Sequence, residues 1–211
     1  MEIYWFETLP STQRYVCDAV RSQTCSLPII VATFDQTDGI GSRHNRWEGI
    51  KGNLFFSCAV GRKHLPEDLP LESTSIYFAV ILLTLLQNKG CDIWLKWPND
   101  FYRQTKKVGG VMTSLIGGHV IVGIGLNIRY APLDFDLLGV DLDPANLLET
   151  FGNKIEDAPS WKEVFSIFRV EFEKNRAYEC HVDGKKVSMN EAVLQEDGSL
   201  QINQTRIYNC R

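Results

Sequence analysis

The chain has 211 residues and a mass of 24.0 kDa, and 44% of its residues are apolar and 23% charged. A chain of this size buries roughly 70% of its unfolded surface on folding, which predicts a soluble globular protein and excludes disorder, a collagen-like repeat and a disulfide-stapled miniprotein. The formal net charge of −4 excludes the strongly basic field that dominates binding to nucleic acid or anionic membranes. A small molecule or another protein is therefore the expected partner.

Three features of the sequence indicate where in the cell the protein works: its cysteines, its amino terminus and its longest apolar run. The six cysteines show no C-x-x-C spacing, so neither a zinc site nor a disulfide framework is expected. The first ten residues lack the cationic start and the apolar stretch of a secretory signal. The longest apolar run, residues 76–86, has 11 residues and falls short of the roughly 20 that cross a bilayer. We therefore expect a buried helix there, no membrane contact and a cytoplasmic protein.

Strand and helix signals alternate along the amino-terminal part of the chain. Ser11 follows Pro10 and predicts a helix N-cap. Two continuous apolar runs of strand length then flank a polar segment that contains glycines. The expected elements are strands at residues 1–8, 29–34 and 54–60, a helix at 12–24 and a polar link at 35–53.

The middle of the chain predicts a buried helix followed by an antiparallel meander. Gly90 stands where a glycine commonly ends a helix, and the turn-forming sequences PND, QTKK and GGH separate the strand patterns. Ser160 predicts an N-cap before a stripe of core residues at helical spacing. The expected elements are helices at 72–89, 145–151 and 160–176 and strands at 93–97, 108–116 and 120–128.

The last 34 residues differ from the rest of the chain in their pattern of apolar and turn-forming residues. Short alternating strand patterns surround two Asp-Gly pairs, at 183–184 and 197–198, and each pair is a strong turn signal. The pattern predicts a small barrel-like appendage that is too small to fold alone. We therefore expect two domains, at residues 1–177 and 178–211.

The polar link contains the most informative segment, TDGIGSRHNRW. Its Gly39 and Gly41 let the backbone pass close to a ligand, and Arg43 and Arg46 are suited to carboxylate or phosphate, before Trp47 ends the segment. A solvated connection with glycine turns is the alternative. The segment is not a dinucleotide-binding fingerprint, because the third glycine is replaced and no helix follows, and no P-loop sequence occurs in the chain.

Two later segments also concentrate polar residues among strands. KWPND places Lys96, Asn99 and Asp100 at the end of a buried strand, where a lysine on a core face needs an anion; a structural Pro-Asn-Asp turn is the alternative. In KKVGGV, the pair Gly109-Gly110 weakens a strand unless a ligand or backbone approaches closely. Lys107 before that pair could neutralise a phosphate or carboxylate, although a lysine beside a strand is more often solvated.

The remaining candidates are hydroxyl and amide groups. Ser11 and Thr12 open the first helix, where they either cap it or hold a polar ligand group at the helix start. Asn127 ends the GIGLN segment beside a buried strand. The four histidines lie far apart, and no Ser-His-Asp or Cys-His pairing stands out, so covalent catalysis has no support in the sequence.

Taken together, these segments resemble the biotin protein ligases (biotin–[acetyl-CoA-carboxylase] ligases) in order and spacing. The resemblance rests on PST, on Gln36 before the glycine-arginine loop that ends in Trp47, on KWPND and on the Lys-x-x-Gly and GxGxN sequences. KWPND followed within ten residues by K-[VL]-[AG]-G is its specific part. It implies an α+β fold with a mixed central sheet backed by helices, as in class II synthetases, and then a small SH3-like barrel.

The resemblance implies ATP-dependent activation of biotin as biotinyl-5′-AMP and its transfer to a lysine of a biotin carboxyl carrier protein, with Mg²⁺ accompanying ATP and no protein-bound metal. The implied catalytic residues are Lys107, Asp100 and Arg43. Those implied for biotin are Ser11, Thr12, Gln36, Gly39, Gly41, Trp47, Gly109 and Gly110. Those implied for the nucleotide are Lys96, Asn99, Asn127 and Arg46.

The chain departs from the family pattern in three places. The family loop reads G-R-G-R-x-G, whereas Ile40 and Ser42 stand at two of its arginine positions. The last residues, TRIYNCR, lack the usual G-E-[IV]-S. No helix-turn-helix segment precedes the catalytic part, so we expect a ligase with no DNA partner and no repressor function. A homodimer remains open, because several family members dimerise through sheet edges.

Other readings stay open beside the ligase. Lipoate or octanoyl transfer uses a related fold but predicts an R-R-x-x-G-G-G loop or an activated cysteine, and the sequence contains neither. A noncatalytic biotin-responsive regulator or carrier-binding module would keep the hydroxyl pair and Gln36 without needing Lys107 or Asp100. A structural protein that merely contains a pocket is the third alternative.

Overall fold

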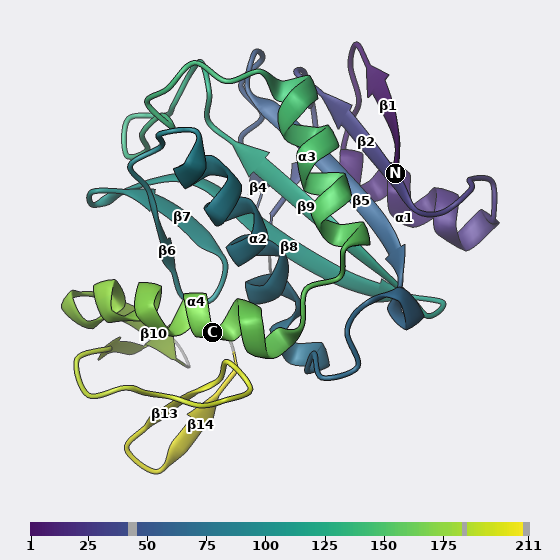
Figure 1. Ribbon diagram of the computed structural model, residues 1–211. Helices are drawn as coiled ribbons and strands as arrows, with labels where there is room; N and C mark the ends of the chain where they lie inside the picture. Colours follow the sequence, from purple (N-terminus) through teal and green to yellow (C-terminus); the bar gives the residue numbers. More distant parts are fainter. Residues whose placement is uncertain (42–45, 183–184, 209–211) are drawn as a thin grey trace.

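A mixed seven-stranded sheet forms the centre of the protein, in a computed structural model that describes residues 1–41, 46–182 and 185–208 (Figure 1). Strands β1 and β2 run parallel, and all the other neighbouring pairs of this sheet are antiparallel. The strands in spatial order are β1 (Glu2–Phe6), β2 (Ile29–Thr33), β5 (Leu54–Gly61), β9 (His119–Leu126), β8 (Lys106–Ile116), β7 (Asp100–Arg103) and β6 (Trp94–Lys96).

Helices cover both faces of the sheet. Helix α1 (Thr12–Ser22) packs on one face through a small cluster that includes Val16 and Ile121. Helices α2 (Thr74–Asn88), α3 (Pro144–Glu156) and α4 (Trp161–Phe172) belong to the large cluster on the other face. Successive strand residues point to opposite faces, so β9 sends its even-numbered residues from Val120 to Leu126 into the large core and its odd-numbered residues toward α1.

Helix α2 is buried nearly all round, as the apolar run predicts. In the described part of the chain, Leu71–Asn88 is the one helical segment long and apolar enough to cross a membrane by length and composition, and 67% of it is buried inside the fold. A helix that is apolar on every side and buried is a core helix. It ends before Gly90, whose φ of +88° is the left-handed conformation expected there.

Local capping explains where the other helices begin. Ser11 accepts a hydrogen bond from the backbone N–H of Arg14, and Ser160 forms a capping box with Glu163. Helix α3 is longer than predicted, because Asp143 caps it at Pro144 and apolar residues continue to Ile155. The predicted core stripe on α4 is confirmed, since Trp161, Val164, Phe168 and Phe172 are buried.

The carboxyl-terminal residues form two small sheets on the same core. A 3₁₀ turn, Glu173–Ala177, leads into β10 (Glu179–Val182) paired with β11 (Lys185–Ser188), and then into β12 (Val193–Leu194), β13 (Leu200–Ile202) and β14 (Thr205–Ile207). Their buried residues, Cys180, Met189, Ala192, Leu200, Ile202 and Ile207, belong to the large cluster. The expected boundary at 177/178 is thus crossed by one continuous core.

The α+β fold with a mixed central sheet and the antiparallel meander are confirmed. Three short strands were not predicted: β7, and the pair β3 (Gly39–Ile40) and β4 (Arg46–Trp47) inside the polar link. Their two to four residues are too few to show a period. The five described cysteines are free thiols, and burial raises the pKa of the Cys58 thiol to about 12.

Candidate functional site

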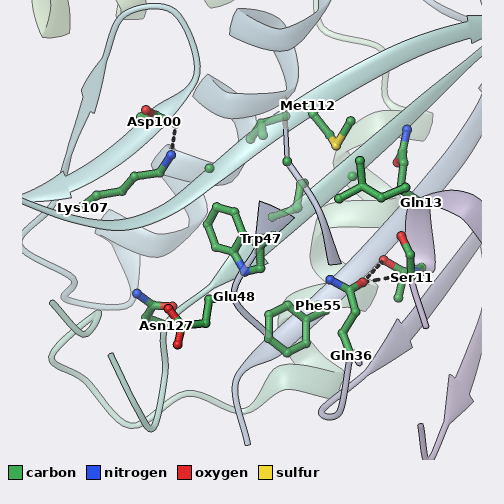
Figure 2. A pocket seen from close by; sticks show the side chains of 18 of the residues that line it. Ser11, Gln13, Gln36, Trp47, Glu48, Phe55, Asp100, Lys107, Met112 and Asn127 are labelled. Atoms are coloured by element: carbon green, nitrogen blue, oxygen red, sulfur yellow. Dashed lines mark hydrogen bonds and ion pairs between the residues drawn. The ribbon is translucent and has the colours of Figure 1, made fainter. Parts of the chain in front are cut away.

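A cavity of about 420 Å³ opens on the α1 face of the sheet (Figure 2). Its walls come from the start of α1, the link between β2 and β5, and strands β5, β7, β8 and β9. The size suits a small organic ligand. The sequence-predicted site residues that line it are Ser11, Thr12, Gln36, Gly41, Trp47, Asn99, Asp100, Lys107, Gly110 and Asn127.

A neutral hydrogen-bond network forms one end of the cavity. The Gln36 Oε1 atom accepts from the backbone N–H of Thr12 at 3.0 Å and from its Oγ1 at 3.3 Å. Ser57 on β5 donates from Oγ to Thr12 Oγ1 at 2.9 Å. All three side chains are buried, so the carboxamide of Gln36 is fixed, with its Nε2 group within 2.6 Å of the position a Cβ on Gly39 would take. Gly39 therefore lets the link pass close to Gln36.

Gln13 carries a buried hydrogen-bond acceptor that no described group satisfies. Its Nε2 donates to Ser114 Oγ at 3.3 Å, whereas its Oε1 has no partner among the described residues. A buried acceptor without a partner is costly, and Gln13 is one of the residues that line the cavity, together with Met112 and Gly123. Gln13 Oε1 is therefore an acceptor at this end of the cavity that the described protein groups leave unsatisfied.

Two glycines on β9 make room for the side chains opposite them. A Cβ on Gly123 would lie 2.5 Å from Gln13 Oε1, and a Cβ on Gly125 would lie 2.6 Å from the Trp47 ring. Ile124 between them points to the large core. The GxG spacing therefore empties one face of the strand, where the cavity lies, and keeps the other face packed.

The charged end of the cavity centres on Lys107. Its Nζ lies 2.6 Å from Asp100 Oδ1 and 5.3 Å from the centre of the Trp47 ring. The Lys107 and Asp100 side chains are 24% and 33% exposed, so solvent screens the pair only in part. A Cβ on Gly110 would lie 3.0 Å from Asp100 Oδ1 and 3.4 Å from Lys107 Nζ. A glycine here leaves the pair accessible to a ligand from the strand side.

Two asparagines close this end. The backbone carbonyl of Asn99 accepts from the N–H of Val111 at 2.9 Å, and the Asn99 side chain donates from Nδ2 to the Val111 carbonyl. Asn127 donates to the carbonyl of Asp136 at 3.2 Å and accepts from Asn53 at 3.4 Å. Both amides therefore fix the surrounding backbone, and both border the cavity.

Several predicted site residues lie elsewhere. Gly109 faces the large core, where a Cβ would lie 2.7 Å from both the Gly125 carbonyl oxygen and Leu126 Cδ2, so its role in the fold is close strand packing. Lys96 is absent from the cavity lining, and its Nζ lies over the rings of Tyr102 and Tyr178 at 5.1 and 5.8 Å.

The two arginines of the loop cannot be placed at the cavity. Arg43 lies outside the described residues. The backbone of Arg46 pairs with Ile40, while its side chain lies outside the description.

Sequence reasoning missed several side chains of the cavity, among them Gln13, Glu48, Phe55 and Met112. Gln13 could have been found, because it follows the hydroxyl pair at the start of a helix. Phe55 and Met112 read as ordinary strand residues, and only the pairing of β5, β9 and β8 puts them on the same face as the glycines.

The cavity joins two kinds of chemistry in one space. The end with Gln13 and Gln36 offers fixed neutral groups. Among the described residues, the other end offers the cation of Lys107, the carboxylates of Asp100 and Glu48, and the Trp47 indole. A ligand with a polar, uncharged head and an anionic tail matches that division. No nucleophile paired with a base lines the cavity in the described residues, so binding, orientation and charge neutralisation are the chemistry it offers.

Comparisons with known proteins agree with this geometry. A model of the biotin/lipoate A/B protein ligase family matches residues 5–128. The bifunctional ligase/repressor BirA of Bacillus subtilis is 26% identical over 161 residues, which are 74% of this chain and 49% of that protein. The chain thus spans about half the length of this curated relative.

Solved structures resemble the chain over nearly its whole length. The biotin acetyl coenzyme A carboxylase synthetase of Helicobacter pylori, with bound biotinylated ATP, is 35% identical with a TM-score of 0.92 and covers 98% of both chains. A biotin protein ligase of Aquifex aeolicus in complex with biotin and ATP has the same fold at 22% identity and a TM-score of 0.71, covering 99% of this chain and 96% of that one. With a family model that matches more than half of its length, the chain belongs to the biotin/lipoate A/B protein ligase family.

Proposed function

We propose that this protein is an ATP-dependent biotin protein ligase, which activates biotin as biotinyl-5′-AMP and transfers the biotinyl group to a lysine of a biotin carboxyl carrier domain. The observation that carries the proposal is the placement of the Lys107–Asp100 ion pair in the same cavity as the neutral network around Gln36. The Helicobacter structure that holds biotinylated ATP supports it.

The neutral end of the cavity suits the ureido ring of biotin. That ring is uncharged and carries two N–H donors and one carbonyl acceptor. The unpaired Oε1 of Gln13 is the acceptor available to a ureido N–H, and Ser11 at the cavity wall supplies a hydroxyl. Phe55 and Met112 give apolar contact to the ring system. The carboxylate tail then extends toward Lys107.

Adenylation brings two anions together. An oxygen of the biotin carboxylate attacks the α-phosphorus of ATP, and pyrophosphate leaves. Repulsion between the carboxylate and the triphosphate opposes this approach, and the Nζ of Lys107, whose side chain is 24% exposed, supplies the opposing charge. In this proposal Arg43 adds a second cation from the loop. The reaction needs no protein nucleophile.

Transfer needs a neutral amine. A lysine with a pKa of about 10.4 is deprotonated in only about one part in a few thousand at pH 7, a deficit of roughly 4 to 5 kcal/mol. Asp100, held 2.6 Å from Lys107, is the carboxylate placed to accept the proton. The amine nitrogen attacks the acyl carbon, and AMP leaves.

Mg²⁺ enters this proposal with the nucleotide. No group of three or more His, Cys, Asp and Glu side chains in the described ranges could hold a metal ion. The side-chain oxygen of Asn99, at the charged end, would contact the metal on the triphosphate, and the metal would reduce the negative charge of the phosphates.

Pyrophosphate release from ATP in the presence of biotin tests the proposal. The wild-type protein is expected to release pyrophosphate only when biotin is present. Lys107→Ala is expected to reduce the rate by at least tenfold, which corresponds to about 1.4 kcal/mol. Lys106→Ala is the matched control, because Lys106 is the exposed neighbour and its Nζ donates to the Leu133 carbonyl outside the cavity. No pyrophosphate from the wild type, or equal rates in both variants, would refute the proposal.

Asp100→Asn separates the two steps. The variant is expected to form biotinyl-5′-AMP and to be slow in transferring biotin to the carrier lysine, because the amide cannot accept the amine proton. Single-turnover assays with isolated biotinyl-5′-AMP measure the transfer alone. Unchanged transfer in this variant would remove Asp100 from the proton-accepting role.

The carrier domain and the absence of repressor activity are also proposals. The net charge of −4 gives this chain no basic surface field for an operator, which supports ligase activity without DNA binding. A carrier domain incubated with this protein, biotin and ATP should gain one biotinyl group by mass spectrometry, and a labelled duplex should show no retardation at the same protein concentration.

A further inference from the structure

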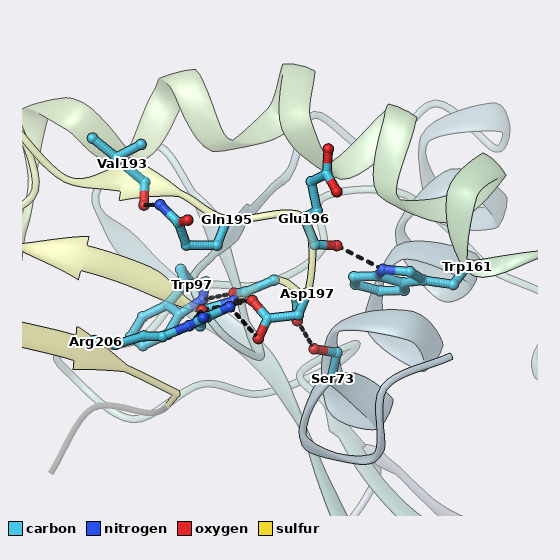
Figure 3. A network of polar contacts seen from close by, with 10 residues as sticks. Ser73, Trp97, Trp161, Val193, Gln195, Glu196, Asp197 and Arg206 are labelled. Atoms are coloured by element: carbon cyan, nitrogen blue, oxygen red, sulfur yellow. Dashed lines mark hydrogen bonds and ion pairs between the residues drawn. The ribbon is translucent and has the colours of Figure 1, made fainter. Parts of the chain in front are cut away.

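The turn Glu196–Gly198 is held by three side chains from the rest of the protein (Figure 3). Its three successive carbonyl groups each accept one hydrogen bond: Glu196 from Trp161 Nε1 at 2.8 Å, Asp197 from Ser73 Oγ, and Gly198 from Trp97 Nε1 at 2.9 Å. The donors come from α4, from the segment before α2 and from the KWPND sequence. The turn is therefore inserted into the catalytic part of the fold.

The turn is rigid in its own right. The Asp197 carboxylate accepts hydrogen bonds from the backbone N–H and the Oγ of Ser199, at 3.1 and 2.6 Å, and forms an ion pair with Arg206 at 2.7 Å. Gly198 has a φ of +80°, and a Cβ there would lie 2.9 Å from Ser73 Oγ and from Ile76 Cδ1. Glycine is the residue that fits both restrictions.

Trp97 is also held through its backbone. Asn175, which is fully buried in the 3₁₀ turn after α4, accepts from the Trp97 N–H through Oδ1 at 2.7 Å and donates through Nδ2 to the Leu95 carbonyl at 2.9 Å. Trp97 itself is 1% exposed. Its main chain and its indole are thus fixed by residues on either side of the expected domain boundary.

Trp97, which these hydrogen bonds hold in place, is close in sequence to two residues of the cavity. Pro98 follows Trp97, and the next two residues are Asn99 and Asp100, both of which border the cavity. Asn99 is anchored on Val111 and Asp100 on Lys107, so the far side of this short segment is fixed on β8. A movement of Trp97 would displace these two polar groups relative to the rest of the site.

We infer that Trp97 is a positioning residue, through which the turn Glu196–Gly198 sets the place of Asn99 and Asp100 for the proposed ligase reaction. The inference rests on the proposed function. It assigns the carboxyl-terminal residues a part in catalysis although the turn is absent from the cavity lining. A misplacement of about 1 Å costs on the order of 100-fold in rate, so a loosened turn would reduce activity without removing any group that contacts the substrates.

Trp97→Phe tests the inference, with Trp161→Phe as its matched control. Each variant removes one indole N–H from the same turn, each starts from a side chain that is at most 5% exposed, and only Trp97 leads into the cavity. Both should lower Tm. At a temperature well below both Tm values, Trp97→Phe should lower kcat for carrier biotinylation by about tenfold or more and raise KM for ATP, with KM for biotin unchanged. Trp161→Phe should lower kcat by no more than about two- to fivefold, because Trp97 keeps its own hydrogen bond to the turn.

Equal kinetics in the two folded variants, or a rise in the biotin KM of Trp97→Phe alone, would overturn the inference. If Trp97→Phe does not fold, Arg206→Ala loosens the turn by removing the exposed arginine of its ion pair with Asp197. Its control is Arg21→Ala, which breaks the exposed pair with Asp18. Arg206→Ala should then lower kcat by about two- to fivefold, and a value equal to that of Arg21→Ala would count against the inference. A wild-type protein that releases no pyrophosphate would instead refute the proposed function.

Discussion

Gly123→Ala should weaken biotin binding while leaving the fold intact. The added Cβ would lie 2.5 Å from Gln13 Oε1 and 3.1 Å from Met112 Cγ, so the Gln13 carboxamide must rotate away. The rotation breaks its 3.3 Å hydrogen bond to Ser114, which contributes about 0.5–1.5 kcal/mol. Replacing glycine by alanine also restricts the unfolded chain, which raises the free energy of unfolding by about 0.4–1 kcal/mol. The two terms nearly cancel, so Tm should change little.

The effect of Gly123→Ala on biotin binding has no such compensating term. If a ureido N–H of biotin donates to Gln13 Oε1, the loss of that hydrogen bond is worth about 0.5–1.5 kcal/mol, or about a 2- to 12-fold rise in the KM for biotin. The KM for ATP should stay the same, because Gly123 and Gln13 belong to the neutral end of the cavity. Both constants come from pyrophosphate release with one substrate varied at saturation of the other.

A double-mutant cycle makes this prediction specific. Gln13→Ala should raise the biotin KM by itself, and Gly123→Ala should add little in that background, because the atom that it displaces is gone. Additive effects of the two substitutions would show that Gly123 acts independently of Gln13. A rise in the KM for ATP in place of that for biotin would refute the assignment of the two ends.

Three other predictions follow from particular contacts. Phe168→Ala should lower the free energy of unfolding by about 3–5 kcal/mol, measured in urea, because the ring is fully buried and packs edge-on against Phe172. Burial raises the pKa of Asp197, but hydrogen bonds from Ser199 and Arg206 outweigh it and hold that pKa below its ordinary value. The stability that Asp197 contributes is therefore present above the unfolded pKa of about 3.9 and is lost as the pH falls through the lower folded pKa, so Asp197→Asn should be less stable than wild type at pH 7 and equal to it once Asp197 is protonated. With an isoleucine at position 40 of the cavity wall, the wild type should release adenylate that labels non-cognate amines, and Ile40→Arg should reduce this labelling; mass spectrometry that finds a single labelled carrier lysine with the wild type would contradict it.

The sequence was most informative where a local signal fixes a local structure. Ser11, Ser160 and Gly90 marked helix ends that the structure confirms, because a cap is decided by a few neighbouring residues. The meander followed from turn sequences between apolar runs. The length of α3 was underestimated, since its apolar residues extend beyond the short stretch from which it was predicted.

The parts that the sequence could not show depend on pairing between distant strands. Gly109 and Gly110 are adjacent and look equivalent, yet the pleat turns Gly109 to the core and Gly110 to the cavity. Lys96 and Lys107 both flank strand patterns, and only the order of β6, β7 and β8 decides which of them borders the cavity. Gln13 was overlooked, although its place directly after the hydroxyl pair at the start of α1 was a signal in the sequence that it lies near the same ligand.

The alternation of side chains along β9 places residues of the core and residues of the cavity at separate positions, so the two sets can change independently in evolution. Residues 120, 122, 124 and 126 are constrained by packing in the large core. Residues 123 and 125 are constrained by the space that a ligand needs in the cavity. A descendant could acquire a different small acid as substrate by changing the second set and the side chains opposite it, with no repacking of the interior. In such a strand, the history of ligand preference and the history of thermal tolerance would be recorded at separate positions.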